Sequence, residues 1–218
     1  MIKAVIFDLD GTLLDTLEDL ANACNYALKV SGFKTHNIKD YIRFVGNGRY
    51  KLIERIVPEN YKKDKETINK VLGLFDEYYE AHMIDMTKPY DGIIEMINEL
   101  KQKNIKMAVV SNKPHEFAEV VVKKYFGDLF EIAYGQRPNH PTKPDPKTVY
   151  EVIYYLDIKK DECIYVGDSD VDIHTAKNAG VKSVGVAWGF RGEKELKEAG
   201  ADYIIKAPIE LLEILYYN

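Results

Sequence analysis

Apolar residues along the chain gather in two kinds of run. Short runs rich in β-branched residues, each closed by a polar or glycine-containing turn, are typical of buried strands in a parallel sheet. Such runs occupy residues 3–7, 107–110, 164–166 and 183–186, with a weaker one at 203–205. We therefore expect at least four parallel strands.

Between these runs, apolar residues recur at the three- and four-residue spacing of a helix with one buried face, over residues 93–100 and 149–156. Alternating strands and helices imply right-handed crossovers and a sheet covered on both faces. The predicted fold class is α/β, a doubly wound, Rossmann-like parallel sheet.

Residues 16–83 break this alternation, because helical stripes follow one another there without a strand between them. One stripe covers residues 17–28 and a second covers 68–79, and the turn at 88–92 marks the return of the chain. We expect an α/β core of residues 1–15 and 84–218, with residues 16–83 inserted as a small helical domain.

Composition and charge narrow the class of protein. The chain has 218 residues, 46% hydrophobic and 30% charged, and none of its apolar runs approaches the roughly 20 residues of a membrane span. The net charge of -5, without a basic cluster, argues against nucleic acid as a partner. Asp8 interrupts the start of the chain where a secretory signal would still be apolar, so we expect a cytoplasmic protein.

Polar side chains follow the predicted strands, where the carboxyl ends of a parallel sheet form a binding crevice. They are Asp8, Asp10, Thr12, Ser111, Asn112, Lys143, Asp168 and Asp172. Four carboxylates in one crevice cannot all stay ionised without a cation, and a hard divalent ion with oxygen ligands, Mg²⁺, is the natural partner. A phosphate site on an acidic protein also needs such local positive charge.

These residues carry a resemblance to the haloacid dehalogenase superfamily of phosphohydrolases. The segment Asp8 to Thr12 matches its first motif, Asp-x-Asp-Gly-Thr, and Ser111 matches the hydroxyl of the second. Lys143 matches the third motif, and residues 167–172 match the fourth, Gly-Asp-Ser-x-x-Asp. All four occur in the family's order, which chance explains poorly.

The resemblance implies a role for each residue. Asp8 would be the nucleophile that forms an aspartyl-phosphate, and Asp10 would be the general acid and base. Lys143 would offset charge in the transition state. Thr12, Ser111 and Asn112 would hold the phosphoryl oxygens, and the metal ligands would be Asp8, Asp10 (through its carbonyl), Asp168 and Asp172.

The inserted helices resemble the family's small helical cap, which implies a small phosphorylated metabolite as substrate. The turn at residues 45–48, with Gly46 and Asn47, and the segment 186–190 look most like phosphoglycolate phosphatases. A carboxylate on the substrate would need a cation such as Arg49, Arg43 or Lys51. A monomer and a homodimer both remain open.

Several alternatives stay open at this point. A sugar-phosphate mutase of the β-phosphoglucomutase type or a pyrophosphatase would carry the same motifs. A non-enzymatic receiver domain also combines Asp, a hydroxyl, Lys and Mg²⁺, but its phosphorylated Asp does not follow the first strand. A catalytically inactive scaffold is a further alternative, and such a protein would be expected to lack a motif residue. Lys113 is expected at the surface or as a capping residue, and Trp188 is assigned neither to packing nor to the site.

Overall fold

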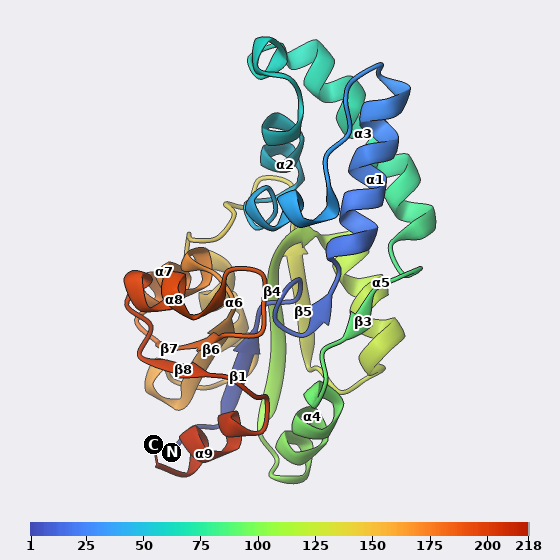
Figure 1. Ribbon diagram of the computed structural model, residues 1–218. Coiled ribbons are helices and arrows are strands. Elements are labelled where there is room, and N and C mark those ends of the chain that lie inside the picture. Colours follow the sequence, from blue (N-terminus) through green and yellow to red (C-terminus); the bar gives the residue numbers. More distant parts are fainter. Residues whose placement is uncertain (218) are drawn as a thin grey trace. The chain divides into compact units, whose positions relative to one another are not determined.

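The computed structural model describes residues 1–217 and shows two compact units (Figure 1). The first, the core unit, consists of Met1–Asp15 and the chain from Pro89 onward. The second, the helical unit, consists of Thr16–Lys88. The chain thus leaves the core unit after Asp15 and re-enters it at Pro89.

The core unit is built on a six-stranded sheet in the order β5-β4-β1-β6-β7-β8, with parallel pairing between neighbours. Its strands are β1 (Ala4–Phe7), β4 (Lys106–Pro114), β5 (Ile132–Gln136), β6 (Cys163–Gly167), β7 (Lys182–Val186) and β8 (Tyr203–Ile205). This confirms the predicted doubly wound α/β fold. The strand order reverses at β1, where doubly wound sheets bind their ligands.

Helices cover both faces of this sheet, as its uniformly buried central strands require. They are α4 (Ile93–Gln102), α5 (His115–Phe126), α6 (Lys147–Tyr155), α7 (Asp170–Ala179), α8 (Gly192–Ala199) and α9 (Glu210–Tyr217), with the 3-10 turn η3 (Lys160–Glu162). One face of β1, β4 and β6 packs in a single apolar cluster with α6 and α7. On the other face, the ring of Phe7 meets Phe130, which follows α5.

The sequence pattern missed β5 for a physical reason. This strand lies at the edge of the sheet, and most of its residues are only half buried, so it lacks the long apolar run of a central strand. Gly135 allows close packing, because a Cβ there would come 2.4 Å from the carbonyl oxygen of Lys113.

The helical unit contains α1 (Leu17–Val30), η1 (Ile38–Arg43), α2 (Arg49–Ile56), η2 (Glu59–Tyr61) and α3 (Lys65–His82). The apolar stripes of α1 and α3 pack against each other and provide the buried core of the unit. The short strands that flank the unit in sequence, β2 (Leu14–Asp15) and β3 (Lys88–Pro89), pair in a two-stranded sheet.

The chain returns to the core unit a few residues later than the expected boundary at residue 83. Asp19, near the start of α1, explains this extension. Its buried carboxylate accepts hydrogen bonds from the Met86 N–H (3.0 Å), the Thr87 N–H (2.8 Å) and the Thr87 hydroxyl (2.7 Å). These bonds hold the segment after α3 within the helical unit.

Candidate active site

Asp8 lies at the carboxyl end of β1, at the switch point of the sheet. Its N–H donates to the Val166 carbonyl (2.8 Å), which continues the pairing with β6 and fixes the backbone. The side chain is buried, and its Oδ1 lies 2.8 Å from Lys143 Nζ.

Lys143 reaches this point from the loop before α6, and Asn112 holds its backbone. The Lys143 N–H donates to Asn112 Oδ1 (2.8 Å), and Asn112 Nδ2 donates to the Lys143 carbonyl (3.2 Å). The ammonium lies between two carboxylates, because Nζ is also 2.7 Å from Asp172 Oδ1. Asn112 therefore connects the end of β4 to the position of the lysine.

Asp168 follows β6 directly, and Asp172 lies in the first turn of α7. The Ser169 N–H and hydroxyl both donate to Asp172 Oδ2, at 3.1 and 2.7 Å, in a capping box that fixes the aspartate. Each of Asp8, Asp168 and Asp172 offers one carboxylate oxygen, and the three oxygens lie within 4.8 Å of one another. Three strand and helix ends thus bring three buried carboxylates together.

The electrostatics of this cluster reflect its negative charge. Burial raises the pKa of Asp8 to about 7, with Asp172 adding to the rise and Lys143 opposing it. Burial, Asp172 and Asp8 likewise raise the pKa of Asp168 well above its ordinary value. Burial alone would lower the pKa of Lys143, but the carboxylates of Asp172 and Asp8 raise it well above the usual range.

The donor set fits a hard divalent cation. One lysine ammonium does not balance three buried carboxylates, and their oxygens are the ligands that Mg²⁺ and similar ions prefer. The structure therefore supports a metal-binding site at Asp8, Asp168 and Asp172.

Asp10, Thr12 and Ser111 complete the set of motif residues at this edge. Asp10 is the most accessible of them, since its side chain is 18% exposed. The Thr12 hydroxyl is fully buried and donates to Asp168 Oδ1 (3.4 Å). Ser111 is also buried, and its Oγ accepts the Lys113 N–H (3.2 Å).

The structure places Lys113 in this site, so the expectation of a surface or capping residue is wrong. Its side chain is only 2% exposed, and its ammonium lies 3.1 Å from Asp10 Oδ1. Lys113 directly follows Ser111 and Asn112 and is the penultimate residue of β4, in which every position after Lys106 is buried. A lysine in such a run needs an acidic partner.

The segment after β7 supports the site, and with it Trp188, which the sequence assigned neither to packing nor to the site. Trp188 Nε1 donates to the Thr12 carbonyl (3.0 Å), and the Phe190 N–H donates to Asp168 Oδ2 (2.8 Å). Gly189 makes the approach possible, because a Cβ there would come 2.3 Å from Asp168 Cβ. This segment therefore orients a carboxylate of the metal site.

The remaining predicted residues belong to the helical unit. Asn47 Oδ1 accepts from Arg55 Nη2 (2.7 Å), which braces the turn that contains Gly46. Arg49 forms an ion pair with Asp76 (2.5 Å), and Lys51 forms one with Glu54 (2.5 Å).

Comparisons with known proteins agree with this geometry. Residues 5–186 match the sequence profile of the haloacid dehalogenase-like hydrolases. The chain belongs to this family. It is 31% identical to the phosphoglycolate phosphatase of Vibrio parahaemolyticus, over 98% of this chain and 96% of that protein. It is also 31% identical to the pyrophosphatase PpaX of Halalkalibacterium halodurans, over 98% and 97% of the two chains.

Solved structures show the same fold. A predicted phosphoglycolate phosphatase of Haemophilus somnus has a TM-score of 0.91 at 27% identity, with 98% of each chain covered. As a haloacid dehalogenase-like hydrolase, the protein is an enzyme whose relatives are phosphatases, and the receiver alternative is excluded. Within the described part of the chain, none of the helices has the length and apolar character needed to cross a membrane.

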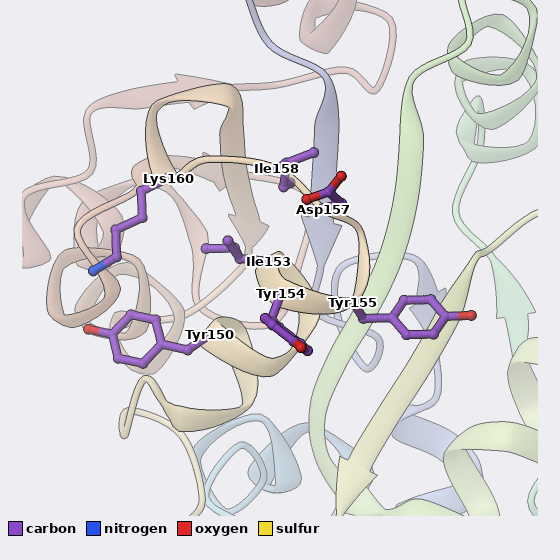
Figure 2. A pocket seen from close by; sticks show the side chains of 7 residues that line it. All are labelled: Tyr150, Ile153, Tyr154, Tyr155, Asp157, Ile158 and Lys160. Atoms are coloured by element: carbon purple, nitrogen blue, oxygen red, sulfur yellow. The ribbon is translucent and has the colours of Figure 1, made fainter.

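A surface hollow beside α6 is not part of this haloacid dehalogenase-like site (Figure 2). Its lining comes from the end of α6 and the connection to β6, namely Tyr150, Ile153, Tyr154, Tyr155, Asp157, Ile158 and Lys160. That connection enters the sheet at the amino end of β6, whereas Asp8 and Asp168 lie at the carboxyl ends of their strands. The hollow contains none of the predicted site residues.

Proposed function

We propose that the protein is a magnesium-dependent phosphomonoester hydrolase that works through an aspartyl-phosphate on Asp8, with 2-phosphoglycolate as its substrate. One observation carries the proposal: the Asp8 carboxylate lies at the switch point of the sheet, 2.8 Å from Lys143 and beside Asp168 and Asp172. A carboxylate in this setting is suited to nucleophilic attack on phosphorus.

The reaction would take place in two displacements. In the first, an Asp8 oxygen forms a bond to phosphorus, the bond from phosphorus to the ester oxygen breaks, and Asp10 gives that oxygen a proton. In the second, water attacks the aspartyl-phosphate, Asp10 takes a proton from the water, and the bond between phosphorus and Asp8 breaks. The products are the alcohol and inorganic phosphate, and Asp8 and Asp10 return to their starting states.

The groups around Asp8 would stabilise the negative charge of the phosphoryl group during the reaction. Lys143 lies close enough to Asp8 to offset the charge that spreads over the phosphoryl oxygens in the transition state. Ser111 and the backbone of Asn112 would hold these oxygens. Asp8, Asp168, Asp172 and the carbonyl of Asp10 would hold Mg²⁺, which, when bound, would neutralise part of the charge of the substrate.

The choice of 2-phosphoglycolate is supported by relatives that carry this activity in their names and match nearly the whole chain. Its carboxylate requires a cation, and the candidates are Arg43, Arg49 and Lys51. Arg49 and Lys51 are already in ion pairs with Asp76 and Glu54, whereas exposed Arg43 makes none within the described residues 1–217.

Pyrophosphate is the second candidate substrate, because the pyrophosphatase PpaX of Halalkalibacterium halodurans is as similar as the phosphoglycolate phosphatases. A sugar-phosphate mutase is distinguished by its product, since it would transfer the phosphoryl group to a second hydroxyl rather than to water.

Steady-state kinetics with Mg²⁺ test both the substrate assignment and the mechanism through Asp8. We expect the highest kcat/KM with 2-phosphoglycolate when it is compared with pyrophosphate, hexose phosphates and other small esters. A better substrate in this panel would overturn the substrate assignment and leave the phosphatase chemistry intact. Turnover of Asp8→Asn at the wild-type rate would overturn the mechanism itself.

A further inference from the structure

Lys113, which is buried, forms an ion pair with the partly buried Asp10 beside the proposed nucleophile. Lys113 Nζ contacts both carboxylate oxygens of Asp10, at 3.1 Å to Oδ1 and 3.3 Å to Oδ2. A lysine that is 2% exposed has lost nearly all its hydration, so a partner of opposite charge is needed to compensate.

The backbone of Lys113 is held firmly at this place. It is the penultimate residue of β4, the strand next to β1 in the sheet. Its N–H donates to Ser111 Oγ (3.2 Å), and its carbonyl packs against Gly135 of β5, where no side chain would fit. The ammonium therefore extends from a fixed backbone, and its contact restricts the rotation of the Asp10 carboxylate.

We propose that Lys113 is a positioning residue that holds the Asp10 carboxylate in the orientation required for proton transfer. The proposal rests on the proposed function, because it takes Asp10 as the group that exchanges protons with the leaving oxygen and with water. A contact to both oxygens fixes the rotation of the carboxylate as well as its position. Small misplacements of such a group lower rates strongly.

The burial of the two side chains distinguishes this role from direct substrate binding. Asp10 is 18% exposed and can reach a ligand, whereas Lys113 at 2% offers a ligand almost no surface. Lys113 is therefore expected to act on the reaction through Asp10 and not by its own contact with the substrate.

This role predicts a dependence on the leaving group. An alkoxide is a poor leaving group that needs a proton in the transition state, whereas 4-nitrophenolate leaves without one. Displacement of Asp10 should therefore slow phosphoryl transfer to Asp8, the step that kcat/KM reports, far more from an alkyl phosphate than from 4-nitrophenyl phosphate.

A double-mutant cycle provides the test, with Lys113→Met, Asp10→Asn and the double variant measured on both esters. On the best alkyl phosphate, we expect Lys113→Met to lower kcat/KM by about 30- to 100-fold, while the loss on 4-nitrophenyl phosphate stays within about 5-fold. In the Asp10→Asn background, measured in single turnovers at high enzyme concentration, Lys113→Met should have no further effect.

Lys106→Met is the matched control, since Lys106 begins the same strand and donates to the Leu156 carbonyl (2.6 Å) away from the site. It should retain wild-type kinetics on both esters. If Lys113→Met does not fold by circular dichroism, Lys113→Gln takes its place in the cycle, because its shorter, uncharged side chain cannot reproduce the ammonium contact to both Asp10 oxygens. The loss with Lys113→Gln should be smaller on the alkyl phosphate, but still greater than the loss on 4-nitrophenyl phosphate.

Equal losses on both esters, or a full additional loss in the Asp10→Asn background, would overturn the positioning role. That result would leave the proposed function intact as long as Asp8→Asn is inactive. An active Asp8→Asn variant would instead remove the proposed function, whatever the cycle shows.

Discussion

Glycines make room for the carboxylates at the centre of the site. A Cβ at Gly167 would lie 2.2 Å from Asp172 Cβ, and one at Gly189 would lie 2.3 Å from both Asp168 Cβ and the Gly11 carbonyl oxygen. These distances are shorter than real Cβ contacts, and the atoms involved are not the ends of flexible side chains. The close approach of residues 188–190 to Asp168 is thus possible only because Gly189 has no side chain.

Gly189→Ala tests this dependence. The added methyl group must displace Asp168 or the turn at Gly11, so we expect a loss of about 1–3 kcal/mol in the free energy of unfolding. Mg²⁺ affinity should fall by at least about tenfold, since displacement of a ligand or its support costs that much. Urea unfolding and metal titration measure both effects. Unchanged Mg²⁺ affinity would show that the segment does not orient Asp168.

At the scale of elements, Asp19 links the start of α1 to the segment after α3. Its carboxylate accepts from two backbone N–H groups and one hydroxyl, and it is almost completely buried. The helical unit is thus closed by side-chain hydrogen bonds in addition to the packing of α1 against α3.

Asp19→Asn should destabilise the helical unit by about 1–3 kcal/mol, because the amide carries only one acceptor oxygen and leaves buried donors unsatisfied. Thr87→Val, which removes one of the donors, should cost less. Chemical denaturation followed by circular dichroism measures both variants. Wild-type stability in Asp19→Asn would mean that these hydrogen bonds make no net contribution to the free energy of unfolding.

Gly73→Ala should have the opposite effect. Gly73 lies inside α3, and a Cβ there would meet nothing within 4 Å. Alanine reduces the conformational entropy that the helix loses on folding, so we expect a gain of about 0.5–1 kcal/mol. Urea unfolding measures this gain in the free energy of unfolding. Gly189→Ala, the same substitution at a crowded position, is the matched comparison. A loss of stability would reveal crowding around α3.

At the scale of the whole molecule, a metal ion at the proposed site would couple stability to ion binding. Asp8, Asp168 and Asp172 are buried together and repel one another, so a cation that binds only the folded state relieves a cost of folding. Folding of the core unit should therefore depend on Mg²⁺ as well as on apolar packing.

Thermal unfolding with and without Mg²⁺ provides the measurement. At 100 times the dissociation constant the ion should add about 2.7 kcal/mol, seen as a higher Tm that EDTA reverses. Asp168→Asn removes a ligand and should abolish most of this shift. An identical Tm in Mg²⁺ and EDTA would contradict metal binding at the carboxylate cluster.

Much of the core unit and its site could be predicted from local patterns. Central strands such as β1 and β6 are buried on both faces, and this requires apolar runs, which end in candidate site residues such as Asp8 and Asp168. The edge strand β5 has no such requirement and was missed. Lys113 was misassigned because residue type favours the surface for lysine, and only its contact with Asp10, which lies 103 positions away in the chain, reverses that preference.

The sequence by itself determined the doubly wound fold and the motif residues at the carboxyl ends of its strands, because burial and turn chemistry act over a few neighbouring positions. Only the tertiary structure decided that Lys113 pairs with Asp10, that Gly189 and Phe190 support Asp168, and that Asp19 extends the helical unit to Lys88. These contacts join residues far apart in the chain. Their formation depends on how the elements pack, which no local pattern records.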